Sequence, residues 1–114
     1  TICAHSCDYW TGTVYTTNRR VWEHDEKFKE HLRTLRCMAV DMETAPLFVA
    51  GFNNEIPTGA LLLVSDQPMV TEGVKTEASD EVVTKQYAHR HLQIGIDSLN
   101  ELKNQGGSVK HLRF

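Results

Sequence analysis

The sequence has no long hydrophobic run, and this absence excludes a helical membrane protein. Its longest uninterrupted apolar stretch covers residues 60–64, whereas a membrane-spanning helix needs about 20 apolar residues. No basic region followed by an apolar stretch opens the chain, so no signal peptide is visible. The formal net charge is -3 and no basic cluster is present. Neither nucleic acid nor an anionic membrane is therefore an expected partner.

Cysteine is scarce, and its distribution argues against both a disulfide framework and a zinc site. Three cysteines are an odd number, which favours a reducing compartment, and we expect the cytoplasm. Cys3, His5 and Cys7 are too closely spaced for a structural zinc site and lack a fourth ligand. His89 and His91 point to different faces of a helix. We predict no metal and no cofactor.

The composition is that of an ordinary soluble protein, with 40% hydrophobic and 24% charged residues. A length of 114 residues predicts a single domain over residues 1–114, large enough for a modest core. The chain begins at Thr1 rather than Met and enters structured-looking sequence almost at once. We therefore expect it to be part of a longer domain.

The first half of the chain predicts alternating strands and helices. Residues 12–17 are rich in β-branched and aromatic residues and predict a strand. A helix is expected from Trp22, because Phe28, Leu32 and Leu35 recur at helical spacing, with acidic residues early and basic residues late. Residues 37–42 are mostly apolar and predict a second, buried strand.

The second half predicts a helix, a strand, a loop and a long helix. Residues 44–53 form the first helix, in which Pro46 is tolerated because it lies in the first turn. The apolar run 60–64 predicts a buried parallel strand. Residues 67–79 predict a loop, long enough to act as a lid. Residues 80–104 predict a helix capped by Ser79 or Asp80. Its expected apolar stripe consists of Val83, Tyr87, Leu92, Ile96, Leu99 and Leu102.

Two carboxylates follow the two apolar strands within residues 37–66. A strand, helix and strand in this order predict a right-handed crossover between parallel strands, which end at the same edge of a sheet. Glu43 follows the first strand and Asp66 the second, so both are expected at the edge where ligands bind in open α/β sheets. Asn18, Arg19 and Arg20 would join them if the strand at 12–17 runs in the same direction.

The two acids are expected to differ in character. Glu43 opens a helix, where the dipole favours an ionised carboxylate that can accept hydrogen bonds from two neighbouring hydroxyls, such as those of a ribose. Asp66 emerges from a run of leucines, and desolvation there would raise its pKa and suit it to proton donation. The alternative interpretation is purely structural, with Glu43 as an ordinary first residue of a helix and Asp66 as a cap.

Several motifs in the right order resemble the purine nucleoside phosphorylase and nucleosidase superfamily, and within it the AMP nucleosidase family. The superfamily's acidic-Met-Glu signature is similar to VDMETA at residues 40–45, and its Ser-Asp after a hydrophobic strand is similar to VSD at 64–66. The AMP nucleosidases are further resembled by GTVYTTNRRVWE at 12–23, GALLLVSDQPM at 59–69, EGVKTEASD at 72–80 and HLQIGID at 91–97. The resemblance implies an α/β fold, the C-terminal part of a nucleoside-phosphorylase-like three-layer α/β/α domain with a mixed, mostly parallel sheet.

The resemblance also implies roles for particular residues. Glu43 would bind the ribose 2′ and 3′ hydroxyls, with Met42 packed against the sugar. Asp66 would protonate or hydrogen-bond N7 of the purine, and Ser65 would shape the base pocket. The base-stacking role falls to Arg20 by position or to Trp22 as the nearby aromatic residue. Lys75 is a candidate contact of a lid or of the substrate phosphate.

The reaction implied is hydrolysis of the N-glycosidic bond of AMP to adenine and ribose 5-phosphate, in a homo-oligomer, commonly a hexamer. Two alternatives stay open. Purine nucleoside phosphorylase activity needs only that phosphate replace water. A non-catalytic half-domain that binds a purine nucleotide or a partner chain is the other, because the Gly-rich phosphate-contacting loops of the superfamily's N-terminal half are not found in this sequence.

Overall fold

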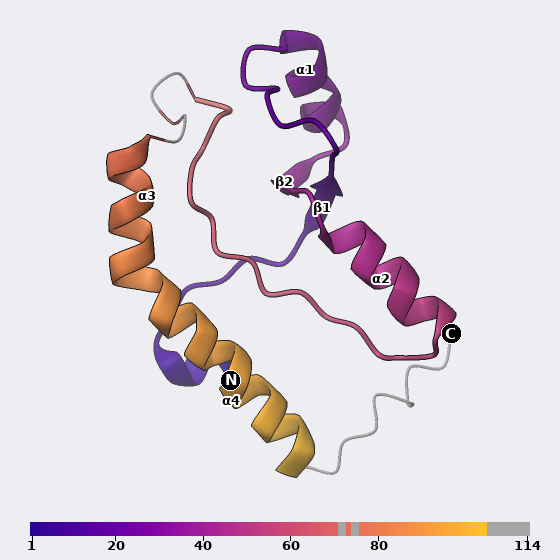
Figure 1. Ribbon diagram of the computed structural model, residues 1–114, viewed down its shortest axis with the longest axis vertical. Helices are drawn as coiled ribbons and strands as arrows, with labels where there is room; N and C mark the ends of the chain where they lie inside the picture. Colours follow the sequence, from indigo (N-terminus) through magenta and orange to yellow (C-terminus); the bar gives the residue numbers. More distant parts are fainter. Residues whose placement is uncertain (71–72, 74–75, 105–114) are drawn as a thin grey trace.

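The computed structural model describes residues 1–70, 73 and 76–104 (Figure 1). Helices alternate with two strands along the first half of the chain, and the second half is an extended segment followed by helices. The elements are η1 (Ile2–His5), β1 (Thr13–Thr16), α1 (Glu26–Thr34), β2 (Cys37–Asp41), α2 (Thr44–Asn53), α3 (Glu77–Val83), the π-helical turn η2 (Thr84–Ala88) and α4 (His89–Asn104).

Strands β1 and β2 pair in parallel through the crossover helix α1. The ladder is irregular after Thr13 and then pairs Val14 with Ala39, Tyr15 with Val40 and Thr16 with Asp41. The α/β class and both of these strands are thus confirmed, within a residue at each end. Because the pairing is parallel, the turn after β1 lies at the same edge as the residues that follow β2, as the sequence predicted for that orientation.

Helix α1 covers the sheet and supplies most of the small core. Asp25 begins the helix by accepting a hydrogen bond from the backbone N–H of Phe28 at 3.0 Å. Phe28 and Leu32, one turn apart, are buried, as their helical spacing predicts, whereas Leu35 is exposed. The helix starts at Glu26 and not at Trp22 as predicted. The helix ends at Leu35, after which Arg36 adopts a left-handed conformation with φ of 53° and turns the chain into β2.

Helix α2 occupies the residues that the sequence predicts, 44–53. Its apolar side chains are largely uncovered, and the most exposed of them is Phe52, at 88%. Gly51 is buried because the chain returns closely past it: a Cβ at this position would lie 1.9 Å from the Thr58 hydroxyl. This close approach directs the chain after α2 back along the helix.

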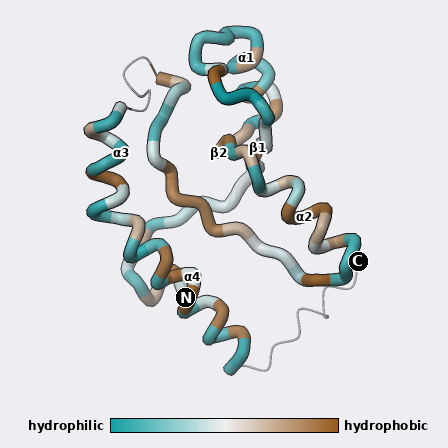
Figure 2. The backbone as a smooth tube through the Cα atoms, viewed as in Figure 1, coloured by the Kyte–Doolittle hydropathy of each residue, from teal (hydrophilic) through white to brown (hydrophobic). Residues whose placement is uncertain are grey.

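The predicted strand at residues 60–64 is wrong. The segment is extended but has no strand hydrogen bonds, and it crosses the middle of the molecule as an apolar coil (Figures 1 and 2). Leu61, Leu62 and Leu63 are 38–40% exposed rather than buried. A strand needs a neighbour to satisfy its backbone groups, and among the described residues the sheet contains only β1 and β2. The crossover from β2 through α2 to a third strand is therefore not formed.

The long C-terminal helix is confirmed, but its start and its buried face differ from the prediction. Helix α3 begins at Glu77, so residues 77–79 are helical rather than loop. Its cap is Thr76, which accepts from the Ser79 N–H at 3.2 Å while the Ser79 hydroxyl accepts from the Thr76 N–H at 3.0 Å. The predicted apolar stripe is exposed apart from the half-buried Val83, with Leu99 at 70%, and Ile94 is the buried residue of α4.

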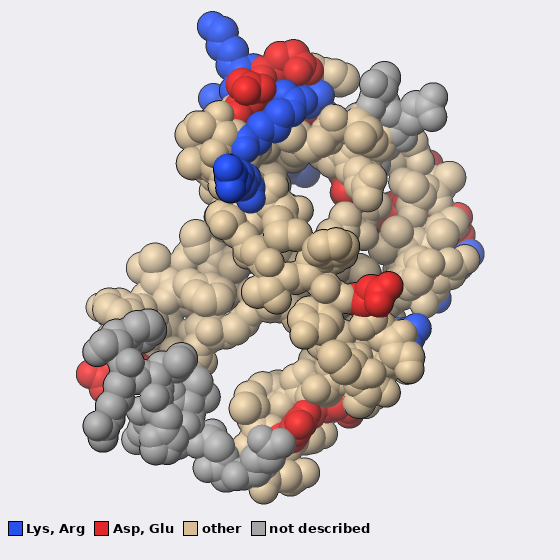
Figure 3. All heavy atoms as spheres, turned by 180° about the vertical axis from the view of Figure 1, so that it is seen from behind, with Lys and Arg blue, Asp and Glu red and all other residues tan. Residues whose placement is uncertain are grey.

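Charged side chains gather over α1 at the top of the molecule, where acidic and basic groups are interspersed (Figure 3). Ion pairs join Lys29 to Glu26 and Arg33 to Glu30, both at 3.2 Å. The face seen in Figure 3 therefore has no patch of one sign over α1. Among the described residues, no helix is both long and apolar enough to cross a membrane.

Candidate functional site

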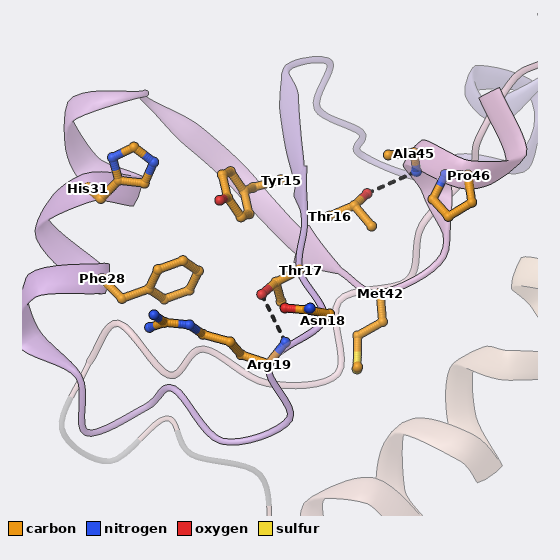
Figure 4. A pocket seen from close by; sticks show the side chains of 10 residues that line it. All are labelled: Tyr15, Thr16, Thr17, Asn18, Arg19, Phe28, His31, Met42, Ala45 and Pro46. Atoms are coloured by element: carbon orange, nitrogen blue, oxygen red, sulfur yellow. Dashed lines mark hydrogen bonds between the residues drawn. The ribbon is translucent and has the colours of Figure 1, made fainter. Parts of the chain in front are cut away.

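A pocket of about 610 Å³ opens at the carboxyl edge of the β1–β2 pair (Figure 4). The chain segments that surround it are the end of β1 with the following turn, the side of α1 that carries Phe28 and His31, and the start of α2 with the residue before it. Its lining consists of Tyr15, Thr16, Thr17, Asn18, Arg19, Phe28, His31, Met42, Ala45 and Pro46. The pocket thus lies at the edge where the sequence predicted a ligand site.

Aromatic rings form one wall of this pocket. Tyr15 meets Phe28 edge-to-face at 5.6 Å between ring centroids and meets His31 at 5.9 Å. Trp22 packs on Phe28 in the same way, also at 5.6 Å, but Trp22 does not line the pocket. Tyr15, Phe28 and His31 therefore present aromatic surface to the pocket, and Trp22 supports Phe28 from outside it.

Arg19 is the cationic residue of the pocket. Its guanidinium carbon lies 5.0 Å from the Phe28 ring centroid, and its Nη1 donates to Asp25 at 2.7 Å. The Phe28 N–H and the Arg19 guanidinium hold the pKa of Asp25 below its usual value. Arg20 is the residue that the family resemblance favours at this turn, but it lies outside the pocket lining; both arginines are exposed. Only the contacts of Arg19 with Asp25 and Phe28 distinguish the two.

The turn that presents Arg19 is fixed by Thr17. This threonine is buried, and its backbone N–H donates to the Asp41 carbonyl at 2.9 Å, which extends the parallel ladder by one bond. Its hydroxyl accepts from the Arg19 N–H at 3.1 Å. The turn after β1 is therefore tied both to β2 and to its own hydroxyl.

Asp41 joins the two strand ends to helix α2. Its Oδ1 accepts from the Thr16 hydroxyl at 2.6 Å, and its Oδ2 accepts from the Thr44 N–H at 2.6 Å and from the Thr44 hydroxyl. The Thr16 hydroxyl also accepts from the Ala45 N–H at 2.9 Å. Partial burial acts to raise the pKa of Asp41, but hydrogen bonds from Thr16 and Thr44 outweigh it and hold that pKa below its usual value.

Glu43 and Met42 lie at this edge with different surroundings. Met42 lines the pocket opposite the aromatic wall (Figure 4). Glu43 is exposed and occupies the N-cap position of α2, yet its side chain makes no capping hydrogen bond. The helix N-terminus provides a positive partial charge beside it. Its carboxylate is therefore available to a ligand approaching the edge.

Ser65 and Asp66 form a pair of their own in the extended segment. The Ser65 hydroxyl donates to Asp66 Oδ1 at 2.5 Å, which orients the carboxyl group, and both residues are half-buried. Neither residue lines the pocket. Because the run before them is not a strand, the structure does not bring Asp66 to the sheet edge in the way the predicted crossover required. Lys75 lies outside the described residues.

The N-terminal residues considered for zinc have other contacts. His5 Nε2 lies 2.8 Å from Asp97 Oδ2 on α4, and Cys7 Sγ contacts the His5 carbonyl at 3.6 Å. Cys3, Cys7 and Cys37 are free thiols. Within residues 1–70, 73 and 76–104, no three metal-binding side chains gather.

The chain belongs to the phosphorylase superfamily, whose family model matches residues 2–100. The motifs that predicted this superfamily lie largely within the matched range.

Among individual proteins, the chain is similar to AMP nucleosidase of Escherichia coli strain K12 and to AMP nucleosidase of Escherichia coli O157:H7. Each is 35% identical over 97 residues, which is 84% of this chain and 20% of the relative. The predicted resemblance to AMP nucleosidase is confirmed, and the chain spans one fifth of the length of these relatives. No solved structure shows a significant match.

Proposed function

We propose that the protein containing this chain hydrolyses the N-glycosidic bond of AMP to adenine and ribose 5-phosphate. The observation that carries the proposal is the aromatic and cationic pocket at the carboxyl edge of the paired strands β1 and β2, which Met42 lines. Glu43 follows Met42 in the chain and is exposed outside the lining of this pocket. The similarity to AMP nucleosidases supports the choice of substrate. Membership of the phosphorylase superfamily supports the more general reaction, which is cleavage of a nucleoside.

Glu43 and Met42 bind the sugar in this proposal. The exposed carboxylate of Glu43 accepts hydrogen bonds from the ribose 2′ and 3′ hydroxyls, and Met42 packs against the ring. As the glycosidic bond breaks, positive charge develops on the sugar, and the ionised Glu43 stabilises it through the hydroxyls that it already holds. The uncapped position of Glu43 at the start of α2 supports this role.

Asp66 is the proposed general acid and protonates N7 of the purine, so that adenine leaves as a neutral base. Ser65 orients the Asp66 carboxyl group through its 2.5 Å hydrogen bond and shapes the base site. For this role Asp66 must approach the sheet edge, and the extended segment that carries it would have to pack against β2. The half-exposed leucines before it are apolar surface suited to that packing.

The purine stacks in the pocket between β1 and α1. Tyr15 offers ring surface, and the Arg19 guanidinium lies 5.0 Å from the centroid of the largely buried Phe28 ring. Arg20 stays a candidate for stacking by position and Trp22 as the nearby aromatic residue, and Lys75 stays a candidate contact of a lid or of the substrate phosphate. A comparison of Arg19 with Arg20 variants separates these assignments.

The proposal extends to the fold and assembly expected from the sequence. We place residues 1–114 in a single partial domain of the three-layer α/β/α type with a mixed, mostly parallel sheet, in a cytoplasmic homo-oligomer, commonly a hexamer. Exposed apolar residues on α2, such as Leu47 and Phe52, support a covering layer or partner at this face.

Chromatographic detection of adenine tests the proposed reaction. The protein as its natural host expresses it is incubated with AMP, adenosine and IMP, and the released base is quantified. We expect adenine from AMP, with much slower cleavage of adenosine and IMP. Absence of base release from AMP, or faster cleavage of adenosine, would overturn AMP as the substrate.

A further inference from the structure

We propose that Asp41 is a positioning residue, which holds Glu43 at the ribose by replacing it as the cap of helix α2. The inference rests on the proposed function and deepens it, because it assigns the residue that sets the sugar contact. Asp41 does not touch the pocket or the substrate in this account. It acts through the start of α2.

Asp41 links the ends of the two strands. Thr16 and Asp41 are the last residues of β1 and β2 and are partners in the parallel register. The Thr16 hydroxyl donates to Asp41 Oδ1 at 2.6 Å and accepts from the Ala45 N–H at 2.9 Å. The ends of β1, β2 and α2 therefore share one closed set of hydrogen bonds.

Asp41 also accepts hydrogen bonds at the start of α2. Asp41 Oδ2 accepts from the Thr44 N–H at 2.6 Å, from the Thr44 hydroxyl and, more weakly, from the Glu43 N–H at 3.4 Å. An N-cap side chain normally accepts from the N–H of the second or third helical residue. In α2 the second, Ala45, donates to the Thr16 hydroxyl that Asp41 holds, and the third, Pro46, has no N–H. Asp41 thus accepts from the Glu43 and Thr44 N–H groups from outside the helix, and the Glu43 carboxylate makes no cap bond.

These hydrogen bonds decide whether the Glu43 carboxylate faces the ligand or its own helix. If the Glu43 carboxylate turned back to bond the Thr44 or Ala45 N–H, it would be removed from the ligand. With Asp41 in place, those N–H groups are occupied and the backbone of Glu43 is fixed on both sides. Loss of Asp41 therefore allows Glu43 to compete for the cap and to abandon the ribose.

The test is a double-mutant cycle on sugar discrimination. In the natural full protein, kcat/KM is measured for AMP and for 2′-deoxy-AMP with wild type, Asp41→Asn, Glu43→Gln and the double variant. The amide keeps the size of the side chain but cannot accept at both ends. We expect Asp41→Asn to lower kcat/KM for AMP about 10- to 100-fold and to affect 2′-deoxy-AMP much less. The double variant should match Glu43→Gln within about twofold.

Two further comparisons separate positioning from a loss of folding. Asn54→Ala removes the side-chain bond to the Ala50 carbonyl at the other end of α2 and should leave the discrimination between sugars unchanged. Thr16→Ser retains the hydroxyl and should keep the discrimination, whereas Thr16→Val should lose it. Calorimetric binding of AMP and 2′-deoxy-AMP provides the same comparison without turnover.

The outcomes distinguish the two proposals. Equal losses for both sugars in Asp41→Asn, or effects of Asp41 and Glu43 that simply add, would overturn the positioning role while AMP hydrolysis stands. A wild-type protein that binds AMP without hydrolysing it would overturn the reaction, and the binding comparison would then decide the role of Asp41. A wild-type protein that neither binds nor cleaves AMP would overturn both.

Discussion

The Thr16 hydroxyl donates a 2.6 Å hydrogen bond to the carboxylate of Asp41, its partner across the parallel β1–β2 pair. This bond connects residues 25 positions apart in the chain at the point where both strands end. Thr16 lines the pocket, and Asp41 caps the helix that begins at Glu43. The pocket and the proposed sugar contact are therefore held by one set of hydrogen bonds.

Asp41 should make stability depend on pH in the acid range. Hydrogen bonds hold its pKa in the folded protein below the unfolded value despite partial burial. Its stabilising contribution is therefore present above the unfolded pKa of about 3.9 and is lost as the pH falls through the folded value. The difference in unfolding free energy between wild type and Asp41→Asn, measured by denaturant titration, should be constant near neutral pH and shrink below about pH 4. The same difference for Asn54→Ala should not vary; a pH-independent Asp41 difference would contradict the assignment.

Replacing Asp66 by Asn should impair chemistry more than binding. The amide keeps the shape of the side chain but cannot deliver a proton to N7, so kcat for adenine release should fall about 10²- to 10⁴-fold. The dissociation constant for AMP should change little. Steady-state turnover and calorimetric binding on the same preparation supply the two numbers. Equal losses in both would remove Asp66 from the acid role.

Glu43→Gln should weaken the distinction between ribose and deoxyribose. The neutral amide has one acceptor oxygen and so cannot hold both hydroxyls as a carboxylate does. We expect kcat/KM for AMP to fall about 10- to 100-fold, with a smaller loss for 2′-deoxy-AMP. Competition between the two substrates in one assay measures the ratio directly. An unchanged ratio would place Glu43 away from the sugar.

Arg19 and Arg20 form a matched pair of neighbouring cations. Arg19 lies over Phe28 and lines the pocket, whereas Arg20 lies outside the pocket lining. Arg19→Ala should therefore weaken AMP binding about 5- to 30-fold, as expected for loss of a cation–π contact together with a charged hydrogen bond. Arg20→Ala should change binding less than about twofold. Calorimetry with AMP measures both, and the reverse order would return the stacking role to Arg20.

The sequence predicts the first half of this fold well because its signals are local. Helical spacing of Phe28 and Leu32 gives α1, and the β-branched and apolar runs give β1 and β2. The strand expected at residues 60–64 fails for a non-local reason: apolar content indicates a buried segment, but a strand also needs a backbone partner, and none pairs with it among the described residues.

In the candidate site, too, local sequence signals succeed where contacts between distant residues are not needed. The acidic-Met-Glu motif predicts sugar contacts for Met42 and Glu43, of which Met42 lines the pocket. Sequence gave no reason to choose Arg19 over Arg20, because the direction of each side chain depends on Asp25 and Phe28 after folding. Asp41 was visible in the motif, yet its function depends on a hydroxyl from the other strand. A polar pair at the ends of two predicted parallel strands is the signal that could have revealed it.

Adenine release from AMP in phosphate-free buffer, with identification of the sugar product, tests the central claim most directly. Hydrolysis predicts equal amounts of adenine and ribose 5-phosphate at a rate that does not require added phosphate. Release of adenine only when phosphate is supplied, with a sugar product carrying a second phosphate at C1, would contradict hydrolysis and identify a phosphorylase.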